Sequence, residues 1–232
     1  MIAAATLAAV ALAAPGATSA PARVSLLASP THVKLVPGGR QVVHVTAAGG
    51  GPLLIDARIA GYRLDLQGRP HVAKAADAAA WLSVSPRRFT VGRGGGVLVV
   101  SSRRPAHAEP GDHSAVVLLS AVVPSARGVV VRMRIGLAVS VRVAGRVLHR
   151  VAVVGARTRS YGRAKMLELT LANRGNVIEL VPAGDLRIVL VRRGQVVARY
   201  LVGRRELLPR TRGLVRLLYR GHDRGGAVAR VR

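Results

Sequence analysis

The sequence predicts an all-β protein made of two antiparallel sandwiches in tandem, placed after an N-terminal signal peptide. Three observations support this prediction. Val129–Val143 has apolar residues at its odd positions and mostly Arg, Gly, Ala or Ser at its even positions, which is the period of a strand with one buried face. Short apolar runs separated by Gly and Pro turns recur along the rest of the chain, and the first twenty residues are uncharged and mainly apolar.

Residues 1–20 indicate a signal peptide. The apolar run Ile2–Ala14 is too short to span a bilayer, and Pro-Gly and the small residues Ala17–Ala20 follow it. No Lys or Arg precedes the run, so a buried N-terminal helix is the alternative. Because the chain has no cysteine, an exported fold has to be stable without disulfides. Thiol mechanisms and thiolate metal sites are excluded for the same reason.

The first sandwich is expected within residues 21–145. Its strands end at turns such as Pro37-Gly-Gly39 and Pro110-Gly-Asp112. Ala73–Ala80 is expected to form one or two helical turns or a loop. The strands expected before the long run Val129–Val143 are His32–Val36, Gln41–Thr46, Leu53–Ile59, Trp81–Val84, Val97–Ser101 and Ser114–Val123.

The second sandwich is expected within residues 146–232, with the boundary near Gly145. Many short strands joined by Gly and Pro turns are typical of immunoglobulin-like sandwiches. No Pro/Ser linker separates the two halves, so we expect them to pack at a fixed angle. The expected strands are Arg146–Val154, Met166–Asn173, Val177–Val181, Leu186–Val191, Val196–Val202, Gly213–Tyr219 and Ala227–Val231.

Trp81 and Phe89 are the only tryptophan and the only phenylalanine of the chain, and both lie in Ala79–Val91. Pro86 lies between them and removes a ladder donor. In a core built otherwise of small aliphatic residues, a tryptophan at a strand end fills much of the interior. We therefore expect Trp81 to be a largely buried core anchor. A ligand platform beside Arg87 and Arg88 is the alternative.

The order of these motifs carries a family resemblance over about residues 24–232. Val36-Pro-Gly-Gly-Arg40, Trp81–Val91 and Pro110–Val117 are followed by the long strand, then by Leu171–Val177 and by Glu206–Arg212. This order resembles that of WxL-interacting proteins, which are Gram-positive surface proteins with two immunoglobulin-like domains. It is also similar, more distantly, to that of periplasmic pilus chaperones.

The resemblance implies a non-catalytic exported protein at the cell surface or in the cell wall. Its first domain would contact peptidoglycan or an anionic wall polymer, and its second domain another surface protein. The alternative is a pilus-type chaperone that binds subunits by strand addition. Family members continue into a transmembrane helix, whereas this sequence stops at Arg232. We expect either a truncated or a released protein, so membrane attachment stays open.

The formal net charge is +26, nearly all from arginine. Such a charge attracts anionic polymers, although GC-rich coding also produces many surface arginines. Paired turn arginines are the candidate ligand-binding residues, because guanidinium groups grip phosphate in a bidentate way. The candidates are Arg87, Arg88, Arg103 and Arg104.

Patterns typical of catalysis or of cofactor binding are weak. His107-Ala-Glu-Pro-Gly-Asp-His113 matches no zinc spacing and is expected to be a solvated turn. Gly92–Gly96 lacks the Gly-Lys-Ser/Thr of a phosphate loop and is expected to be a hairpin turn. No serine lies in a Gly-x-Ser-x-Gly elbow. With six aromatic residues in all, base stacking is disfavoured. We therefore expect no enzyme, cofactor, metal or nucleic-acid partner.

Overall fold

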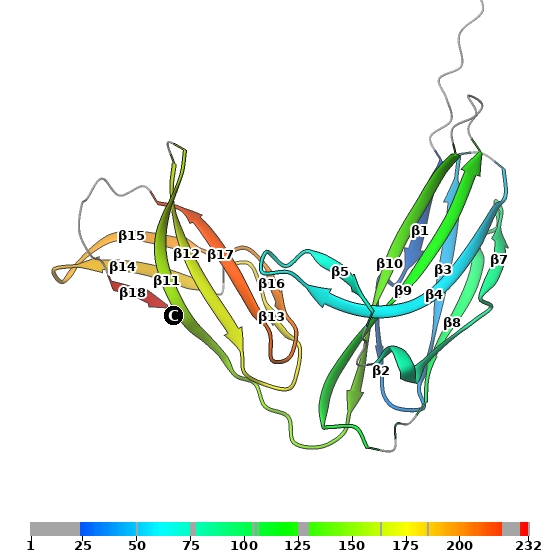
Figure 1. Cartoon of the computed structure of the whole chain (residues 1–232), viewed down its shortest axis with the longest axis horizontal. Helices are drawn as coiled ribbons and strands as arrows, with labels where there is room; N and C mark the ends of the chain where they lie inside the picture. The colour runs from blue at the N-terminus through cyan, green and yellow to red at the C-terminus, as the bar shows by residue number, and fades with distance from the viewer. Residues whose placement is uncertain are drawn as a thin grey trace, which may run out of the picture.

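A computed structural model describes residues 24–49, 51–74, 78–103, 105, 107–124, 130–162, 164–184, 186–219 and 228–231. Every element in these ranges is a strand except one 3-10 turn, η1 (Ala79–Trp81). The prediction of two tandem immunoglobulin-like sandwiches is confirmed (Figure 1). The signal peptide expected at residues 1–20 lies outside the described residues. Within the described ranges, no helix has the length and apolar character needed to cross a membrane.

The first sandwich consists of two sheets. One sheet has the order β1-β3-β8-β6, and the other has the order β2-β10-β9-β4-β5, with β7 also paired to β4. The bounds are β1 Ser25–Ser29, β2 His32–Leu35, β3 Arg40–Ala48, β4 Leu53–Leu64, β5 Pro70–Ala73, β6 Leu82–Ser85, β7 Arg88–Val91, β8 Gly96–Ser102, β9 Gly111–Pro124 and β10 Val130–Val143.

The first strand run changes sheets half-way. β1 pairs antiparallel with β3 in one sheet, whereas β2 pairs in parallel with β10 in the other sheet. Pro30 lies between them and cannot donate to a ladder. β2 covers only Ala138–Val141 of β10, although β10 pairs with β9 along its whole length from Val130 to Val143.

The second sandwich is formed by the sheets β11-β12-β17 and β15-β14-β18, with the two-stranded pair β13-β16 beside them. The bounds are β11 Val151–Tyr161, β12 Ala164–Asn173, β13 Glu179–Val181, β14 Arg187–Arg192, β15 Gln195–Leu201, β16 Arg205–Leu207, β17 Arg212–Leu218 and β18 Val228–Val231. The boundary near Gly145 stays a prediction; β10 ends at Val143 and β11 begins at Val151.

Each sandwich has its own core of aliphatic side chains. Ile55, Leu119 and Leu137 are fully buried in the first core, and Leu169 and Ile188 in the second. The alternation predicted for Val129–Val143 is confirmed in the second half of β10, where Leu137, Val139 and Val141 are buried. In its first half Arg132 and Arg134 are exposed, but so is Val131, and Val129 lies outside the described residues. Burial of this apolar surface is the main favourable term for a chain without disulfides.

Three sequence expectations need correction. Trp81 packs against the first core but is only partly buried, because it lies in η1 at the end of the sandwich beside the second domain. Its ring contacts that of His113, with centroids 4.7 Å apart. The expected helical turns at Ala73–Ala80 are reduced to η1, with residues 75–77 outside the described ranges. The strand expected at Arg146–Val154 begins instead at Val151 and continues to Tyr161.

The two domains lie at an angle to each other, with the end of β4 and β5 reaching toward β13 and β16 (Figure 1). The turn that joins β4 to β5 contacts the second domain directly. Leu66 accepts a backbone hydrogen bond of 2.5 Å from Leu214, and Gln67 accepts one of 3.1 Å from the Arg205 guanidinium. Asp65 shapes this turn, because its carboxylate accepts bonds from the backbone N–H groups of Gln67 and Arg69.

Neighbouring residues on β4 provide a test of the first core. Ile55 is 0% exposed and Leu54 is 47% exposed. We expect Ile55→Ala to lower the free energy of unfolding by about 2–5 kcal/mol, through lost transfer energy and a residual cavity. The matched control Leu54→Ala should change it by about 0.5 kcal/mol or less. Chemical denaturation measures both values, and equal losses would contradict the assigned burial.

Candidate binding site

One edge of β10 is open over half of its length. The Ala138 N–H donates to the Thr31 carbonyl on the β2 side of the strand. Because alternate residues of a strand direct their N–H groups to the same edge, and the β9 register is continuous, the N–H groups of Arg132, Arg134 and Gly136 point away from β9. No strand of the described residues pairs with them. We call the backbone edge of residues 130–137, on the side away from β9, the free edge.

Apolar side chains accompany the free edge. Val131 is 47% exposed, and Met133 and Ile135 are partly buried against the first core. They lie on the same face of β10 as the buried Leu137. β1 of the other sheet also contacts β10. A row of partly exposed apolar side chains beside unpaired backbone groups is the arrangement that accepts an additional strand.

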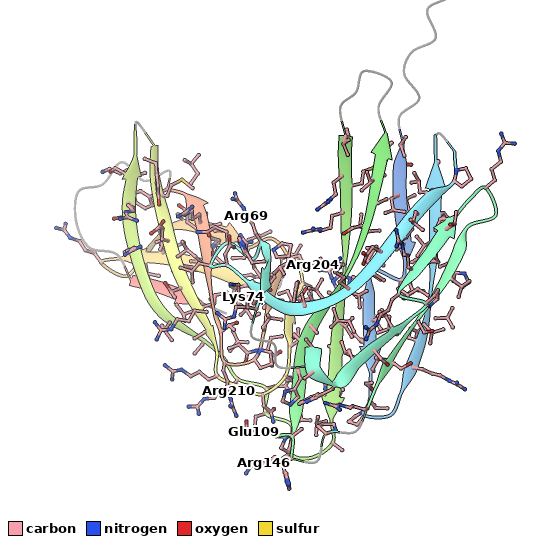
Figure 2. The ribbon with its side chains drawn as sticks, turned by 45° about the vertical axis from the view of Figure 1, so that its right-hand side comes forward. Arg69, Lys74, Glu109, Arg146, Arg204 and Arg210 are labelled. Atoms are coloured by element: carbon pink, nitrogen blue, oxygen red, sulfur yellow. The ribbon has the colours of Figure 1, made fainter. Side chains whose placement is uncertain are left out.

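An interdomain cleft begins where the free edge ends. Its volume is about 740 Å³, within the usual range for ligand sites. Ala138 and Ser140 of β10 line it beside β2, and the second domain contributes Ile178 and Leu180. Figure 2 shows Arg204 between the two domains. The other polar lining residues are His32, Lys34, Arg40, Tyr62, Asp112, Ser114, Arg142, Arg204 and Glu206.

The cleft carries more positive than negative charge. Asp112 is paired with Arg142, and Glu206 lies 4.0 Å from His32. No carboxylate of the described residues forms an ion pair with Lys34 or Arg204. Burial raises the pKa of Tyr62 to about 12, and the Glu206 charge adds to this effect, so the phenol stays protonated and can donate. These groups suit an anionic or carbonyl-bearing ligand.

Ser114 provides a further polar group at the cleft. Its residue is 8% exposed, and its hydroxyl has no hydrogen-bond partner among the described residues. A buried hydroxyl without a partner is costly. A ligand in the cleft could supply the missing hydrogen bond.

Asp112 holds the two domains together at the wall of the cleft. Its carboxylate accepts hydrogen bonds from both Nε and Nη2 of Arg142, the latter at 2.7 Å. The same carboxylate accepts the backbone N–H of Ile178 in the second domain at 2.8 Å. The Asp112 N–H in turn donates to the Asn176 carbonyl at 2.8 Å. With 7% of the residue exposed, these bonds are protected from water.

Asn176 completes this junction. Its amide nitrogen donates to the carbonyls of Pro110 and Arg146, each at 2.8 Å, and its amide oxygen accepts the Leu148 N–H at 2.7 Å. At the outer side of the junction Arg210 and Glu109 form an ion pair at 2.6 Å, and Figure 2 shows them close together near Arg146. The domain angle is therefore held by several short polar contacts.

A second buried carboxylate lies in the second sandwich, away from the cleft lining. Glu168 of β12 accepts hydrogen bonds from the Tyr161 hydroxyl at 2.6 Å, from Arg157 at 2.9 Å and from Arg216 at 3.0 Å. These hydrogen bonds lower the pKa of Glu168 to about 2, and the bond from Tyr161 has the largest effect. All three donors satisfy the carboxylate, so we assign the cluster a structural role.

The candidate arginines do not gather at one site. Arg87 and Arg88 follow β6, whereas Arg103 lies at the other end of that strand, where its N–H donates to the Trp81 carbonyl. Arg104 lies outside the described residues. Their ligand-binding role stays a prediction.

The hairpin turn predicted at Gly92–Gly96 is present, but the solvated turn predicted at His107–His113 needs correction, because β9 begins at Gly111 and Asp112 is buried. Gly92 and Gly95 form a hairpin bridge. His113 Nε2 lies 2.8 Å from the Glu109 carbonyl oxygen, and its ring contacts Trp81. No group of three or more His, Asp or Glu side chains in the described part could hold a metal ion.

Sequence reasoning missed the residues of the free edge and of the cleft. Val131, Met133 and Ile135 were visible as the apolar positions of a strand, but alternation does not tell which edge stays unpaired. Lys34 and Arg204 are far apart in sequence and line the same cleft only because the domains fold toward each other. The signal available was Lys34 itself, one of three lysines in a chain that otherwise uses arginine.

Comparison with known proteins identifies the architecture. No family model matches the chain, and no curated protein matches it in sequence. Among solved structures, the YadV chaperone matches with TM-score 0.52 and 12% identity, covering 89% of this chain and 98% of that one. The chain has the fold of pilus chaperones.

Two further structures agree. The class 5 fimbriae chaperone CfaA matches with TM-score 0.51 and 11% identity over 89% of this chain and 98% of its own. The CsuC–CsuE chaperone–tip adhesion subunit complex of Acinetobacter baumannii matches with TM-score 0.51 and 12% identity, over 88% and 92%. Of the two families that the sequence resembles, the pilus chaperones, which are the more distant, share this fold. The comparisons do not show membership of the WxL-interacting family.

Asp112 provides a test of the junction. Asp112→Ala removes the acceptor for Arg142 and for the Ile178 N–H, so we expect the domains to sample wider angles. Small-angle X-ray scattering should show a larger radius of gyration, and protease should cut residues 144–150 faster. The control Asp56→Ala loses only an exposed pair with Arg58 inside the first domain. An equal increase in the radius of gyration and in the cleavage rate of both variants would show that Asp112 does not hold the domain angle.

Glu168 provides a test by pH. Its pKa is about 2 in the folded protein against an ordinary 4.5. A lowered folded-state pKa contributes stability that is complete above about pH 4.5 and is lost as pH falls through about 2. We expect Glu168→Gln to lower the thermal midpoint at pH 7 by several degrees and to flatten the fall in midpoint between those values. A wild-type acid profile in the variant would contradict the assignment.

Proposed function

We propose that this protein is a non-catalytic, extracytoplasmic chaperone of the pilus type, which binds an extended segment of another surface protein by strand addition. The observation that carries the proposal is the free edge of β10. It offers the N–H groups of Arg132, Arg134 and Gly136 beside three partly exposed apolar side chains. The shared fold of solved pilus chaperones supports the same function.

The cleft supplies a place for the end of such a segment. A strand beside residues 130–137 lies in line with β2, whose first residues line the cleft. Lys34 and Arg204 have no carboxylate partner among the described residues, and the Ser114 hydroxyl is unpartnered. The carboxylate that ends a polypeptide would satisfy these groups. The Asp112 junction keeps the cleft at a fixed width for it.

The alternative, an adaptor on peptidoglycan or an anionic wall polymer, has no support from the comparisons. The candidate arginines also do not form one binding surface for such a polymer, since Arg87 and Arg88 lie apart from Arg103. Fractionation separates the two hypotheses. An adaptor should sediment with purified cell walls. We expect this protein instead to remain in the supernatant when walls are added, and to co-purify with soluble surface subunits.

Hydrogen exchange tests strand addition directly. The probe is an eleven-residue peptide in which valine alternates with glutamine. In the full chain, we expect the amides of Arg132, Arg134 and Gly136 to exchange fast without peptide and slowly with it. Those of Val131, Met133 and Ile135 face β9 and should be slow in both states. NMR resolves the two sets.

Two controls make the result specific. A peptide N-methylated at alternate residues cannot donate to the free edge and should give no protection. Met133→Ser/Ile135→Ser should weaken peptide binding by at least tenfold, because each partly buried side chain loses apolar contact. Val122→Ser, at an exposed position on β9, should not weaken it. An equal slowing of both sets of amides on adding peptide, or no slowing of either set, would overturn strand addition.

A further inference from the structure

We infer that the segment added to β10 alternates apolar with acidic residues, so that its carboxylates lie opposite Arg132 and Arg134. This inference rests on the proposed function and specifies its partner. The two arginines are consecutive on the outward face of the free-edge half of β10. The odd residues Val131 and Met133 lie on the opposite face, where Met133 packs against the core and Val131 is 47% exposed. A partner strand therefore meets a basic row on one face and an apolar row on the other.

The geometry brings a partner's side chains within reach of both arginines. Residues directly opposite in neighbouring strands have Cβ atoms about 4.5–5.5 Å apart, and opposite charges there stabilise the pair. Arg134 donates from Nε to Ser120 at 3.3 Å, so its two terminal nitrogens stay available. Arg132 pairs with Val122 across the ladder, which offers it no charge.

The described part of the chain has no carboxylate left to neutralise these arginines. Each of its seven Asp and Glu side chains already lies within 4.0 Å of a basic side chain. The pairs are Asp56–Arg58, Asp65–His71, Glu109–Arg210, Asp112–Arg142, Glu168 with Arg157 and Arg216, Glu179–His149 and Glu206–His32. None of these seven carboxylates is paired with Arg132 or Arg134, so a bound segment can supply the counter-charge at the free edge.

The alternation also prevents wrong binding. A basic residue opposite Arg132 or Arg134 would place like charges across the ladder, which is destabilising. An entirely apolar segment would leave the arginines without a partner while covering one side of them. The pattern thus selects the segment and fixes its register, because a slip of one residue puts the acids on the apolar face.

The test compares two peptides of eleven residues on the full chain: valine alternating with glutamate, and valine alternating with glutamine. At low salt we expect the glutamate peptide to bind about 3- to 10-fold more tightly, as two exposed cross-strand ion pairs allow. The difference should shrink at about 0.5 M salt, where the Debye length falls toward a few ångströms.

Charge-matched variants locate the effect. Arg132→Gln/Arg134→Gln should abolish the preference for glutamate, so that the two peptides bind this variant equally well. Arg87→Gln/Arg88→Gln removes the same charge near β7, on the far side of β4 and β9 from the free edge, and should keep the preference. Thermal unfolding of both variants confirms that they fold.

Each other outcome decides against the inference. Equal binding of the two peptides, with protection of the free-edge amides, would overturn the acidic pattern and leave strand addition intact. Loss of preference in both double variants would mean that net charge alone acts. Displacement of the glutamate peptide by linear polyphosphate would make an anionic polymer the occupant. Failure of both peptides to bind would overturn the proposed function together with the inference.

Discussion

The Asp112 carboxylate is the contact on which the two-domain arrangement depends. It receives the Arg142 guanidinium from the end of β10 and the Ile178 N–H from the start of the second domain. A buried hydrogen-bonded charge loses much stability when its partners separate, so the domains are held at the angle that keeps these bonds. The cleft, with Lys34 on one side and Arg204 on the other, exists only at that angle.

The free edge has a different physical origin, the change of sheet between β1 and β2. A strand run that stayed in one sheet would either cover β10 along its length or leave it wholly open. Because β2 pairs only with Ala138–Val141, that part of β10 is hydrogen-bonded on both edges, whereas residues 130–137 keep one edge open for another strand. An open edge is normally an aggregation hazard, which exposed charges reduce. Arg132 and Arg134 lie where such charges are needed, so the same residues protect the edge and select its partner.

The arginine excess is explained only in part by this arrangement. Arg142, Arg157 and Arg216 satisfy buried carboxylates, Arg205 and Arg210 cross the domain junction, and Arg132 and Arg134 flank the free edge. Arg88 lies opposite Asp56 across the β4–β7 ladder, and its charge helps the hydrogen bond from Arg58 to lower the pKa of that carboxylate. Nothing in the structure explains Arg87 beyond a backbone contact. A high net charge of itself favours solubility and diffuse attraction to polyanions, which is why the described pairings matter more than the total.

The sequence by itself determined the all-β class, the two-sandwich architecture and the buried and exposed faces of β10, because side-chain alternation and Gly/Pro turns are local properties of the chain. It also identified the hairpin turn at Gly92–Gly96, but it assigned to a turn Gly111 and Asp112, which begin β9. It placed Trp81 too deep, since burial at the end of a sandwich depends on what the next domain covers. Only the tertiary structure decided which edge of β10 stays open, and that Asp112, a turn residue in sequence, joins Arg142 to Ile178. Strand pairing and domain contact link residues far apart in the chain, and no local pattern records them.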